Sequence, residues 1–550
     1  MPLFSCPLHG SKLVVHPSFC QQRLLSIRHN FMNNKNSLNL DKEVYKQLRA
    51  QSWDALWLHE APLFDAGTAE YRLARVGLVR ALGVVALEKG TKEQRKQTQQ
   101  WLMSLLEDPQ EKVRRYAMVA LPKLGGKKES EAALLSLLDQ STEAREVVHL
   151  SRTLDKIGGE ATLDKLAQLQ NSSETLQQTE QKIKAQLARN DPSTKVLMNV
   201  KIRDARGLRI HLRTRRGMET FVRDELLGHS RLSERFKILR VSPGCVAISA
   251  DKVFTLGELY ELRTFGSVNF VLGSAKDTTN DVATLAKLIG SKRTQRLCTK
   301  LTAGQPRYRL DFIRQKVTPS KAQAVVNQAF ALCPELLNDA RQAPWAIEVY
   351  PEKVGLSVEL SPRVLPDPRF AYRVDDVPAS THPQLAAAMA RLAGVESQDV
   401  VWDPFCGSGL ELIERSLLGE VKTIIASDID KKAVAVARLN LESACKGGEA
   451  LAIHRCDFLN FREVTNIAPG SVSLIIANPP LGRRVRVDDL PGLISSFYRV
   501  AAETLCPGGR LVFINPLKLD SPVPSLKLQE RHLVDLGGFN CRVEKWVKSI

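Results

Sequence analysis

The sequence predicts a multidomain protein in which a helical repeat array and an α+β module precede a C-terminal α/β domain with a doubly wound sheet. Three observations support this fold class. The chain has 550 residues, which is too long for a single hydrophobic core. A helical motif recurs about every 30 residues between 42 and 190, as in stacked helical pairs. Strands and helices alternate from Asp376 onward, which is typical of a parallel sheet covered by helices.

Composition and charge indicate a folded protein with a basic surface. Hydrophobic residues make up 43% of the chain and the net charge is +18, so we expect polyanions as partners. The mean hydropathy is −0.17 and no apolar run is long enough to span a bilayer, so we expect no membrane partner. The ten cysteines show no C-x-x-C pair and no Cys/His ligand spacing. We therefore expect no metal site, no disulfide framework and a reducing compartment.

Residues 1–40 have the composition of an organellar transit peptide. They contain no Asp or Glu, whereas Lys12, Arg23, Arg28 and Lys35 are basic and serines are frequent. This predicts a chloroplast or mitochondrial location. The alternative is a basic N-terminal tail on a cytoplasmic protein.

Residues 42–190 predict helical pairs. A turn at Glu107–Pro109, an amphipathic helix over Val113–Ala117 and a glycine stop form one copy, and Leu137–Gly159 repeats the same plan. The segment resembles a short array of HEAT-type repeats, with Leu106–Pro109 and Val113-Arg114 at the turn and second helix. Two functions stay open for such an array, a docking surface for a protein partner and a spacer that packs on the next domain.

Residues 200–361 predict an α+β module after a polar turn at Asn190–Ser193. Strands and helices alternate irregularly in this segment, with two strands in succession at its end. Five strands are expected: two begin at Ile210 and Tyr308, and three cover Val246–Ser249, Trp345–Val349 and Gly355–Leu360. The expected helices cover Thr220–Leu227, Leu256–Leu262 and Lys321–Leu332.

Basic residues concentrate in this module, which favours contact with RNA. One run lies between Lys201 and Arg240, and in a second run from Lys292 to Lys321 only Asp311 is acidic. The order of Arg216–Glu219, Glu225-Leu226 and Leu262–Thr264 resembles the N-terminal half of THUMP-containing RNA methyltransferases. The first run comprises Lys201, Arg203, Arg206, Arg209, Arg213, Arg215, Arg216, Arg223, Arg231, Arg235, Lys237 and Arg240.

Polar residues follow four successive strands of the C-terminal domain, residues 370–550. The ends of parallel strands meet at one edge of a sheet, where such folds bind ligands. A turn with Gly407 and Gly409 lets a ligand approach the backbone, and the spacing favours contact of Asp428 with ribose hydroxyls. The strands and the residues that follow them are Val400–Trp402 with Asp403–Gly409, Thr423–Ala426 with Ser427–Asp430, Ala452–Cys456 with Asp457-Phe458, and Val472–Ala477 with Asn478–Gly482.

The fourth strand must stop at Asn478, because Pro479 and Pro480 have no N–H to continue a ladder. The Asn478 side-chain carbonyl and a backbone carbonyl then point the same way, which suits the exocyclic NH2 of a flat substrate. Asp457 is placed to take an adenine amino group. A nicotinamide dehydrogenase is disfavoured, because it would need a G-x-G-x-x-G turn.

These four segments resemble the motifs of class I S-adenosylmethionine-dependent methyltransferases that modify exocyclic amines of RNA bases. The resemblance implies a Rossmann-like fold, S-adenosyl-L-methionine as cofactor, and a lead-in through Phe370–Arg373 and Pro378–Pro383 that closes over the cofactor. Cys406 is expected to be a small packing residue in the cofactor turn. The implied cofactor-binding residues are Asp403, Pro404, Cys406, Gly407, Gly409, Asp428, Ile429, Asp457 and Phe458; the catalytic residues are Asn478, Pro479 and Pro480; and Leu481 and Gly482 are expected to contact the substrate. Arg483 and Arg484 follow immediately and are expected to hold substrate phosphates; the alternative is a solvated charged loop.

One position departs from the family pattern. Related sites have an aromatic residue after N-P-P that stacks on the flipped base, and this chain has Leu481. Such stacking supplies roughly 1–3 kcal/mol, so we expect Phe405, Phe497 or Tyr498 to replace the ring. The predicted activity is methylation of guanine N2 in rRNA or tRNA. The alternatives are an adenine-N6 methyltransferase acting on RNA or DNA and an RNA-binding assembly factor with weak turnover. A fifth strand at Leu511–Ile514 and an edge strand at Lys545–Lys548 complete the expected sheet.

Overall fold

The computed structural model describes residues 44–549 apart from 126, 142, 170–172, 190–193, 204–206, 276–281, 379, 446–448 and 483–486. The chain divides into two compact units, Met1–Leu187 and Ala188–Ile550. The predicted transit peptide, residues 1–40, lies outside the described residues.

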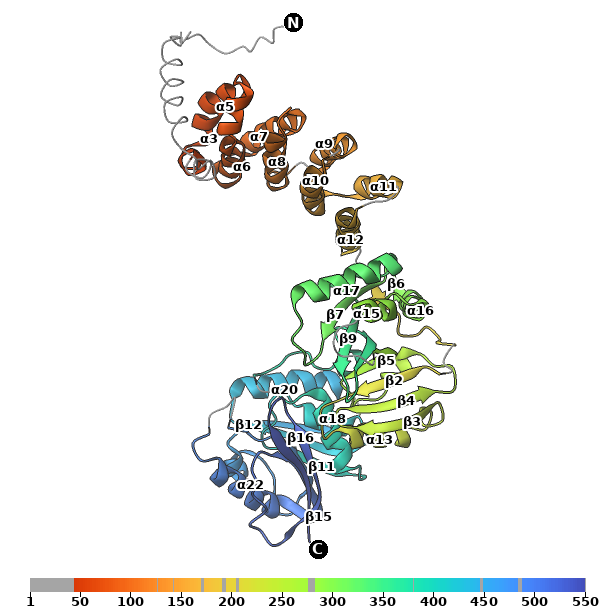
Figure 1. Cartoon of the computed structure of the whole chain (residues 1–550). Helices are drawn as coiled ribbons and strands as arrows, with labels where there is room; N and C mark the ends of the chain where they lie inside the picture. Colours follow the sequence, from red (N-terminus) through yellow and green to blue (C-terminus); the bar gives the residue numbers. More distant parts are fainter. Residues whose placement is uncertain are drawn as a thin grey trace. The chain divides into compact units, whose positions relative to one another are not determined.

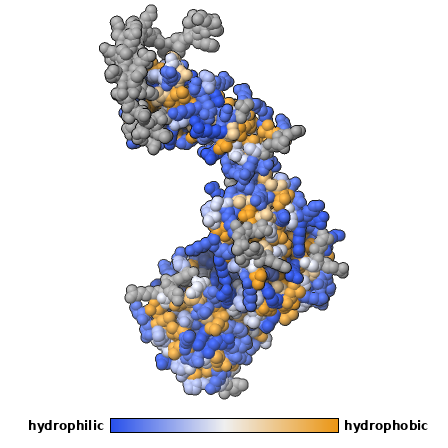
Figure 2. Space-filling model, in the orientation of Figure 1, coloured by the Kyte–Doolittle hydropathy of each residue, from blue (hydrophilic) through white to orange (hydrophobic). Residues whose placement is uncertain are grey.

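The first unit is helical throughout its described residues, in agreement with the sequence (Figure 1). In α10, buried Leu150, Leu154 and Ile157 follow a helical spacing, so one face enters the core. Buried Glu131 of α9 accepts hydrogen bonds from the backbone N–H groups of Gly159 and Thr162 and so ties α9 to the start of α11. The visible face of this unit in Figure 2 is largely hydrophilic. The principal helices are α3 Trp53–Ala55, α4 Ala61–Asp65, α5 Ala69–Ala74, α6 Gly77–Lys89, α7 Lys92–Ser104, α8 Glu111–Ala120, α9 Lys127–Gln140, α10 Ala144–Ile157, α11 Glu160–Gln168 and α12 Glu174–Arg189, and short π or 3-10 turns cover Leu56–Glu60, Leu105–Glu107 and Leu121–Lys123.

The second unit begins with a mixed eight-stranded sheet in the order β3-β4-β2-β5-β10-β9-β7-β8. Neighbours are antiparallel from β3 to β9, and β7 is parallel to β9 and to β8. Its strands are β2 Arg209–Arg213, β3 Phe236–Ser242, β4 Cys245–Ala250, β5 Ser267–Ala275, β7 Arg307–Phe312, β8 Leu337–Asn338, β9 Trp345–Pro351 and β10 Leu356–Pro362; the helices are α13 Glu219–Gly228, α14 Leu256–Leu259, α15 Val282–Ile289, α16 Lys292–Lys300 and α17 Pro319–Leu332; and β1 Lys195–Val196 pairs with β6 Thr302–Ala303.

Several cations of the first basic run form ion pairs instead of a continuous positive surface. Arg213 and His211 on β2 both contact the buried carboxylate of Glu359 on β10. Because the Glu359 carboxylate is fully buried, these pairs hold His211 and Arg213 against the sheet. The sequence showed the charges of this run but not their acidic partners. Further pairs join Arg223 to Asp224, Arg231 to Glu261, Arg235 to Glu258 and Lys237 to Asp251.

A seven-stranded sheet in the order β13-β12-β11-β14-β15-β17-β16 follows. The first five strands are parallel, and β17 is antiparallel to both β15 and β16. Leu474 and Ile476 of β14 face one hydrophobic core and Ile475 and Ala477 the other, so helices cover both faces. The strands are β11 Asp399–Asp403, β12 Val421–Asp428, β13 Ala450–Arg455, β14 Val472–Ala477, β15 Leu505–Asn515, β16 Leu526–Asp535 and β17 Asn540–Lys548; the helices are α18 Pro383–Ala393, α19 Leu410–Ser416, α20 Lys431–Ala444, α21 Phe461–Val464 and α22 Leu490–Thr504.

One prediction about this sheet is wrong. The C-terminal strand β17 is not at the edge, because β16 forms an additional strand outside it. Half of the β16 positions are exposed, among them Lys527 to Glu530 in succession. A strand with so little apolar alternation gives no period-2 signal in the sequence.

The two sheets of the second unit are joined by buried polar contacts and by close backbone packing. Arg263 donates two hydrogen bonds to the Glu414 carboxylate of α19, at 2.7 and 2.8 Å. Arg391 of α18 donates to Glu225 of α13 at 2.7 Å. At Gly217 an added Cβ would overlap the carbonyl oxygen of Leu533 on β16. These contacts bring the loop after β2 to the rim of the parallel sheet.

Candidate active site

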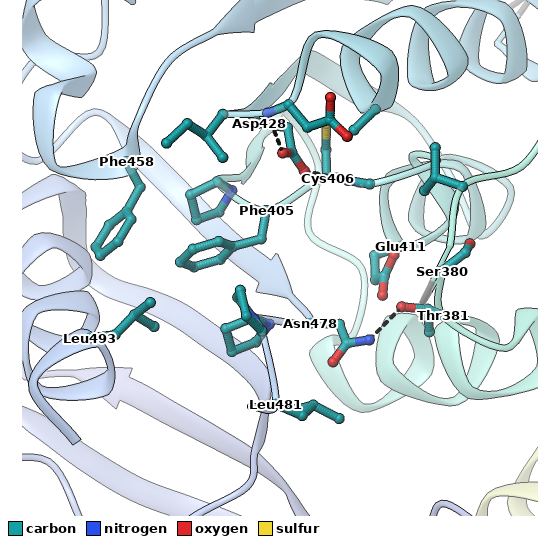
Figure 3. Close-up of a pocket in the computed structure, with 18 of the residues that line it drawn as sticks. Ser380, Thr381, Phe405, Cys406, Glu411, Asp428, Phe458, Asn478, Leu481 and Leu493 are labelled. Carbon is teal, nitrogen blue, oxygen red and sulfur yellow. Dashed lines mark hydrogen bonds between the residues drawn. The ribbon is translucent and has the colours of Figure 1, made fainter. Parts of the chain in front are cut away.

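A cavity of about 980 Å³ lies at the carboxyl ends of β11, β12, β13 and β14 (Figure 3). Four parallel strands end there, as the sequence predicts for a ligand site. Twelve residues that the sequence singled out line the cavity together: Pro404, Phe405, Cys406, Gly407, Asp428, Ile429, Asp457, Phe458, Asn478, Pro479, Pro480 and Leu481.

The glycine-rich turn after β11 forms one wall. Gly407 and Gly409 have φ of 50° and 79°, a backbone conformation that favours glycine. The Gly407 N–H donates to the Asp428 carboxylate at 3.0 Å and links this turn to the end of β12. Asp403 and Gly409 do not line the cavity. Asp403 is buried beneath the turn, accepts a hydrogen bond from the Phe405 N–H at 2.9 Å, and has a pKa raised well above its usual range by burial.

The Asp428 carboxylate lines the cavity and accepts hydrogen bonds from the backbone. Its two oxygens accept one backbone hydrogen bond each, from Gly407 and from Asp430. Burial raises the pKa of this carboxyl, and the two backbone N–H groups oppose the rise. Each oxygen keeps acceptor capacity for a ligand hydroxyl. Asp457 lies at the neighbouring strand end, where it caps a short 3-10 helix by accepting from the Leu459 N–H at 3.0 Å.

Asn478 has one amide atom fixed and the other free. Its Nδ2 donates to Thr381 Oγ1 at 2.8 Å, as Figure 3 shows. Its Oδ1 is buried and has no hydrogen-bond partner. A buried acceptor without a donor costs about 1–3 kcal/mol. The arrangement therefore favours a ligand that brings an N–H or O–H group to Oδ1.

Glu411 of α19 lies beside Thr381, the residue that holds the Asn478 amide. The carboxyl is fully buried beside Thr381, and its Oε1 has no hydrogen-bond partner. Burial raises its pKa to about 7, and a hydrogen bond with Thr381 acts in the opposite direction. A threonine hydroxyl has one proton to donate. When that proton goes to Glu411, Thr381 can only accept from Asn478, so Nδ2 faces Thr381 and Oδ1 faces the ligand.

Only one of the three aromatic rings expected to replace the missing one is at the cavity. Phe405 lines it, packed against Phe458 and Phe497 with ring centroids 4.9 and 5.4 Å apart. Phe497 and Tyr498 are fully buried in the adjacent core and do not reach the wall. Leu481 lines the cavity near Asn478 (Figure 3).

Other predicted residues occupy different positions. Cys406 is buried at the wall, and burial raises the pKa of its thiol well above the usual range, so it is a packing residue and not a thiolate. Gly482 adopts φ of 71° beyond the lining residues. Arg483 and Arg484 lie outside the described residues.

Sequence reasoning missed several lining residues. The Leu536–Phe539 turn between β16 and β17 contributes to the wall, as does Arg215 from the loop after β2. Glu411 also lines the cavity. A lone arginine in a basic run and a glutamate in a helix give no signal of a pocket. The segment Pro378–Pro383, expected to close over the cofactor, does contribute Pro378, Ser380, Thr381 and His382 to the wall.

The described part of the chain has neither a cluster of metal ligands nor a helix suited to a membrane. Among residues 44–549, with the gaps given above, no three His, Cys, Asp or Glu side chains are grouped as metal ligands would be. None of the described helices combines the length and the apolar character that a membrane crossing needs.

Comparisons with known proteins match this part of the chain. The UPF0020 family, described as an RMKL-like methyltransferase domain, matches residues 371–522. A tRNA (guanine(6)-N2)-methyltransferase of Thermus thermophilus is 35% identical over 204 residues, 36% of this chain and 58% of that protein. A tRNA (guanine(10)-N2)-dimethyltransferase of Methanocaldococcus jannaschii is 32% identical over 144 residues, 26% of this chain and 40% of that protein. The chain thus spans about half the length of these relatives.

The fold is shared with a solved structure. TrmN from Thermus thermophilus superposes with a TM-score of 0.50 at 21% sequence identity, over 62% of this chain and 99% of that one. At this identity the likeness concerns the fold alone.

Proposed function

We propose that this protein transfers a methyl group from S-adenosyl-L-methionine to an exocyclic base amine of RNA, guanine N2 in tRNA. The observation that carries the proposal is the buried, unpartnered Oδ1 of Asn478 at the wall of the cavity. An exocyclic amine is the donor that this acceptor lacks. The match of residues 371–522 to a methyltransferase family supports the reaction type.

The residues at the strand ends fit the proposed cofactor. The Asp428 carboxylate keeps acceptor sites for ribose hydroxyls, Asp457 is placed for an amino group, and the turn at Gly407 leaves the backbone open. The cavity of about 980 Å³ is at the upper end of small-molecule sites, roughly 300–1,000 Å³, as expected for a cofactor and a base together. S-adenosyl-L-methionine, when bound, supplies an electrophilic methyl group on a sulfonium.

The protein's part in the reaction is to position and polarise the amine. A base amine is a poor nucleophile because its lone pair is delocalised into the ring. Hydrogen bonds donated by the NH2 to Asn478 Oδ1 and to the Pro479 carbonyl favour a tetrahedral nitrogen and direct its lone pair into the cavity. The base must leave its stack to reach this wall. Phe405 offers a ring for it, which supports turnover over the assembly-factor alternative suggested by Leu481.

The relatives favour guanine in tRNA. The amide acceptor alone would equally serve adenine N6, so the site chemistry does not separate the two bases. Relatives from Thermus thermophilus and Methanocaldococcus jannaschii are named tRNA guanine-N2 enzymes. These names support guanine over adenine and tRNA over rRNA.

The remaining parts support an RNA substrate. The successive helices α7 to α12 support the HEAT-like assignment of the first unit, and the mixed sheet before the parallel sheet supports a THUMP-like module. We also infer from composition that residues 1–40 direct the protein to an organelle.

The proposal is tested with purified full-length protein and Asn478→Ala. We expect the variant to bind S-adenosyl-L-methionine with unchanged affinity in calorimetry and to lose roughly 100- to 1000-fold in kcat on unmodified tRNA, as for loss of one preorganised group. Thr381→Val should lower kcat roughly 10- to 100-fold because the amide loses its anchor, whereas Thr381→Ser retains the hydroxyl and activity. Mass mapping of nucleosides then identifies the modified base.

Two results would contradict the proposal. Wild-type protein without affinity for S-adenosyl-L-methionine would exclude the reaction. Equal kcat for Asn478→Ala and wild type would exclude the role of this amide.

A further inference from the structure

A second, smaller groove lies in the helical unit and is lined by cations. Its volume is about 180 Å³, and it is formed by α6, α8 with the turn that follows, and α10. The lining side chains of the three helices converge on one concave surface. They are Arg80, Gly83, Val84, Arg115, Tyr116, Val119, Ala120, Lys123 and His149. We call this surface the basic groove.

Further cations extend the groove along α10. Arg145, His149, Arg152 and Lys156 follow one another at steps of four, three and four residues, so they share one face of the helix. From Arg145 to Lys156 this row is about 16 Å long at 1.5 Å per residue, enough for several backbone phosphates. Burial and the neighbouring Arg115, Arg152 and Arg145 lower the pKa of His149, which is consistent with a positive potential at this face.

The acids of the unit do not neutralise these charges. Cations and acids are nearly balanced in number over residues 44–187. Acids at other places hold structural arginines, as Glu146 does with Arg114, Asp108 with Arg72 and Glu60 with Arg75. In the groove Arg115 is paired with Glu111 at 2.9 Å. Within the described helices no ion pair joins Arg80, Lys123, Arg145 or Arg152 to an acid.

The shape and lining of the groove favour a phosphate backbone over an acidic protein. A volume of about 180 Å³ admits a phosphate or a single side chain, but not a cluster of apolar anchors. Its apolar lining is limited to small or β-branched residues. Tyr116 lies in the groove, and the Arg80 guanidinium stacks 4.6 Å from the ring centroid of Tyr45. Guanidinium groups and aromatic faces together are typical of nucleic-acid contacts.

We propose that the basic groove binds the phosphate backbone of the RNA substrate. This inference rests on the proposed function for the identity of the polyanion. It assigns the helical unit to substrate binding through electrostatic contacts that are independent of base sequence.

The test compares two triple variants of the full chain. Arg80→Gln/Arg145→Gln/Arg152→Gln removes one cation of the groove and two of the row that extends it along α10, none of them paired with an acid among the described residues. Lys89→Gln/Lys92→Gln/Lys96→Gln removes three exposed cations outside it and has the same net charge. Binding of unmodified tRNA transcripts is measured by fluorescence anisotropy at several salt concentrations, with S-adenosyl-L-methionine affinity and thermal unfolding as controls for the fold.

We expect the groove variant to bind tRNA at least 10-fold more weakly at low salt. Its slope of log affinity against log salt should decrease by about 2 to 3, because each lost phosphate contact contributes about 0.9. KM for tRNA should rise while kcat at saturation stays unchanged. The lysine variant should bind like wild type.

Equal affinity and equal salt slope for the two triple variants would overturn the inference. Competition by poly-glutamate as effective as that by tRNA would also overturn it and would indicate an acidic protein partner. Failure of the proposed function is distinct: wild type would then neither bind S-adenosyl-L-methionine nor methylate tRNA, whatever the groove variant does.

Discussion

Glu411 is a carboxyl group that folding largely removes from water. It is fully buried at the cavity wall beside Thr381, and its pKa is raised from 4.5 to about 7, first by burial. Folding therefore favours the protonated carboxyl. The stability that follows is complete below pH 4.5 and is lost as the pH rises through about 7.

Glu411→Gln should become the more stable protein at high pH. The glutamine has no charge to bury, so the difference in unfolding free energy between variant and wild type should grow in favour of the variant between pH 4.5 and 8. With about 1.4 kcal/mol per pKa unit, the change is on the order of 3 kcal/mol. Urea unfolding at pH 5 and pH 8 measures this difference in unfolding free energy. Groups that titrate alike in variant and wild type do not contribute to it. Neighbouring Asp403 does contribute, because Glu411 also raises its pKa. A difference that is the same at both pH values would show that Glu411 titrates normally.

The acceptors at the strand ends could be predicted from the sequence, and their partners could not. Asp428, Asp457 and Asn478 each follow an apolar run directly, so the strand ends locate them. Thr381 and Glu411 act on Asn478 only because α18 and α19 pack beside β14. This packing is a tertiary contact, and no residue spacing in the sequence predicts it.

At the scale of elements, the β16–β17 hairpin connects the catalytic sheet to the mixed sheet. The Asp535 N–H donates to the Arg216 carbonyl at 2.9 Å, and Gly217 with φ of 91° lies against Leu533. Arg215 and the turn containing Gly537 both line the cavity, so this contact shapes the wall.

Gly217→Ala should separate the loop after β2 from the hairpin. Its Cβ would overlap the Leu533 carbonyl, in addition to the cost of about 1–2 kcal/mol for a side chain in the left-handed region. Gly470→Ala is the matched control, because Gly470 has φ of 71° but open space around its Cβ position. We expect Gly217→Ala to lose at least about 2 kcal/mol more stability than the control and to raise KM for tRNA. Equal losses in both variants would mean that the contact does not hold the hairpin.

Prediction of the elements succeeded where periodicity was strong. The boundaries of the four apolar strands β11, β12, β13 and β14 lie within two residues of their expected positions. The sequence did not predict β3 and β5 of the mixed sheet. In β3 exposed positions dominate after Phe236, and β5 is buried at most positions without strict alternation. Both strands are determined by their neighbours in the sheet, which a single sequence does not show.

At the scale of the whole molecule, the cations fall into two groups, those that form buried ion pairs and those without an acidic partner. The net charge of +18 predicted a basic surface, yet many arginines of the second unit are used inside it, among them Arg213, Arg263 and Arg307. In the helical unit Arg80 and Lys123 of the basic groove, and Arg145 and Arg152 of the row on α10, have no ion pair with an acid among the described residues. The charge count alone does not say which cations have acidic partners; only the fold separates the paired arginines from those without an acidic partner.

The two units should therefore divide binding between them. Every residue that lines the larger cavity lies between 215 and 539, inside the unit Ala188–Ile550. A fragment of residues 188–550 should bind S-adenosyl-L-methionine with an affinity within about 2-fold of the full chain in calorimetry. Without the basic groove it should bind unmodified tRNA more weakly, and its affinity should fall less steeply with salt. A fragment that folds by circular dichroism but has lost affinity for S-adenosyl-L-methionine would mean that the helical unit contributes to the cofactor site. Unchanged tRNA affinity would mean that the second unit alone holds the RNA.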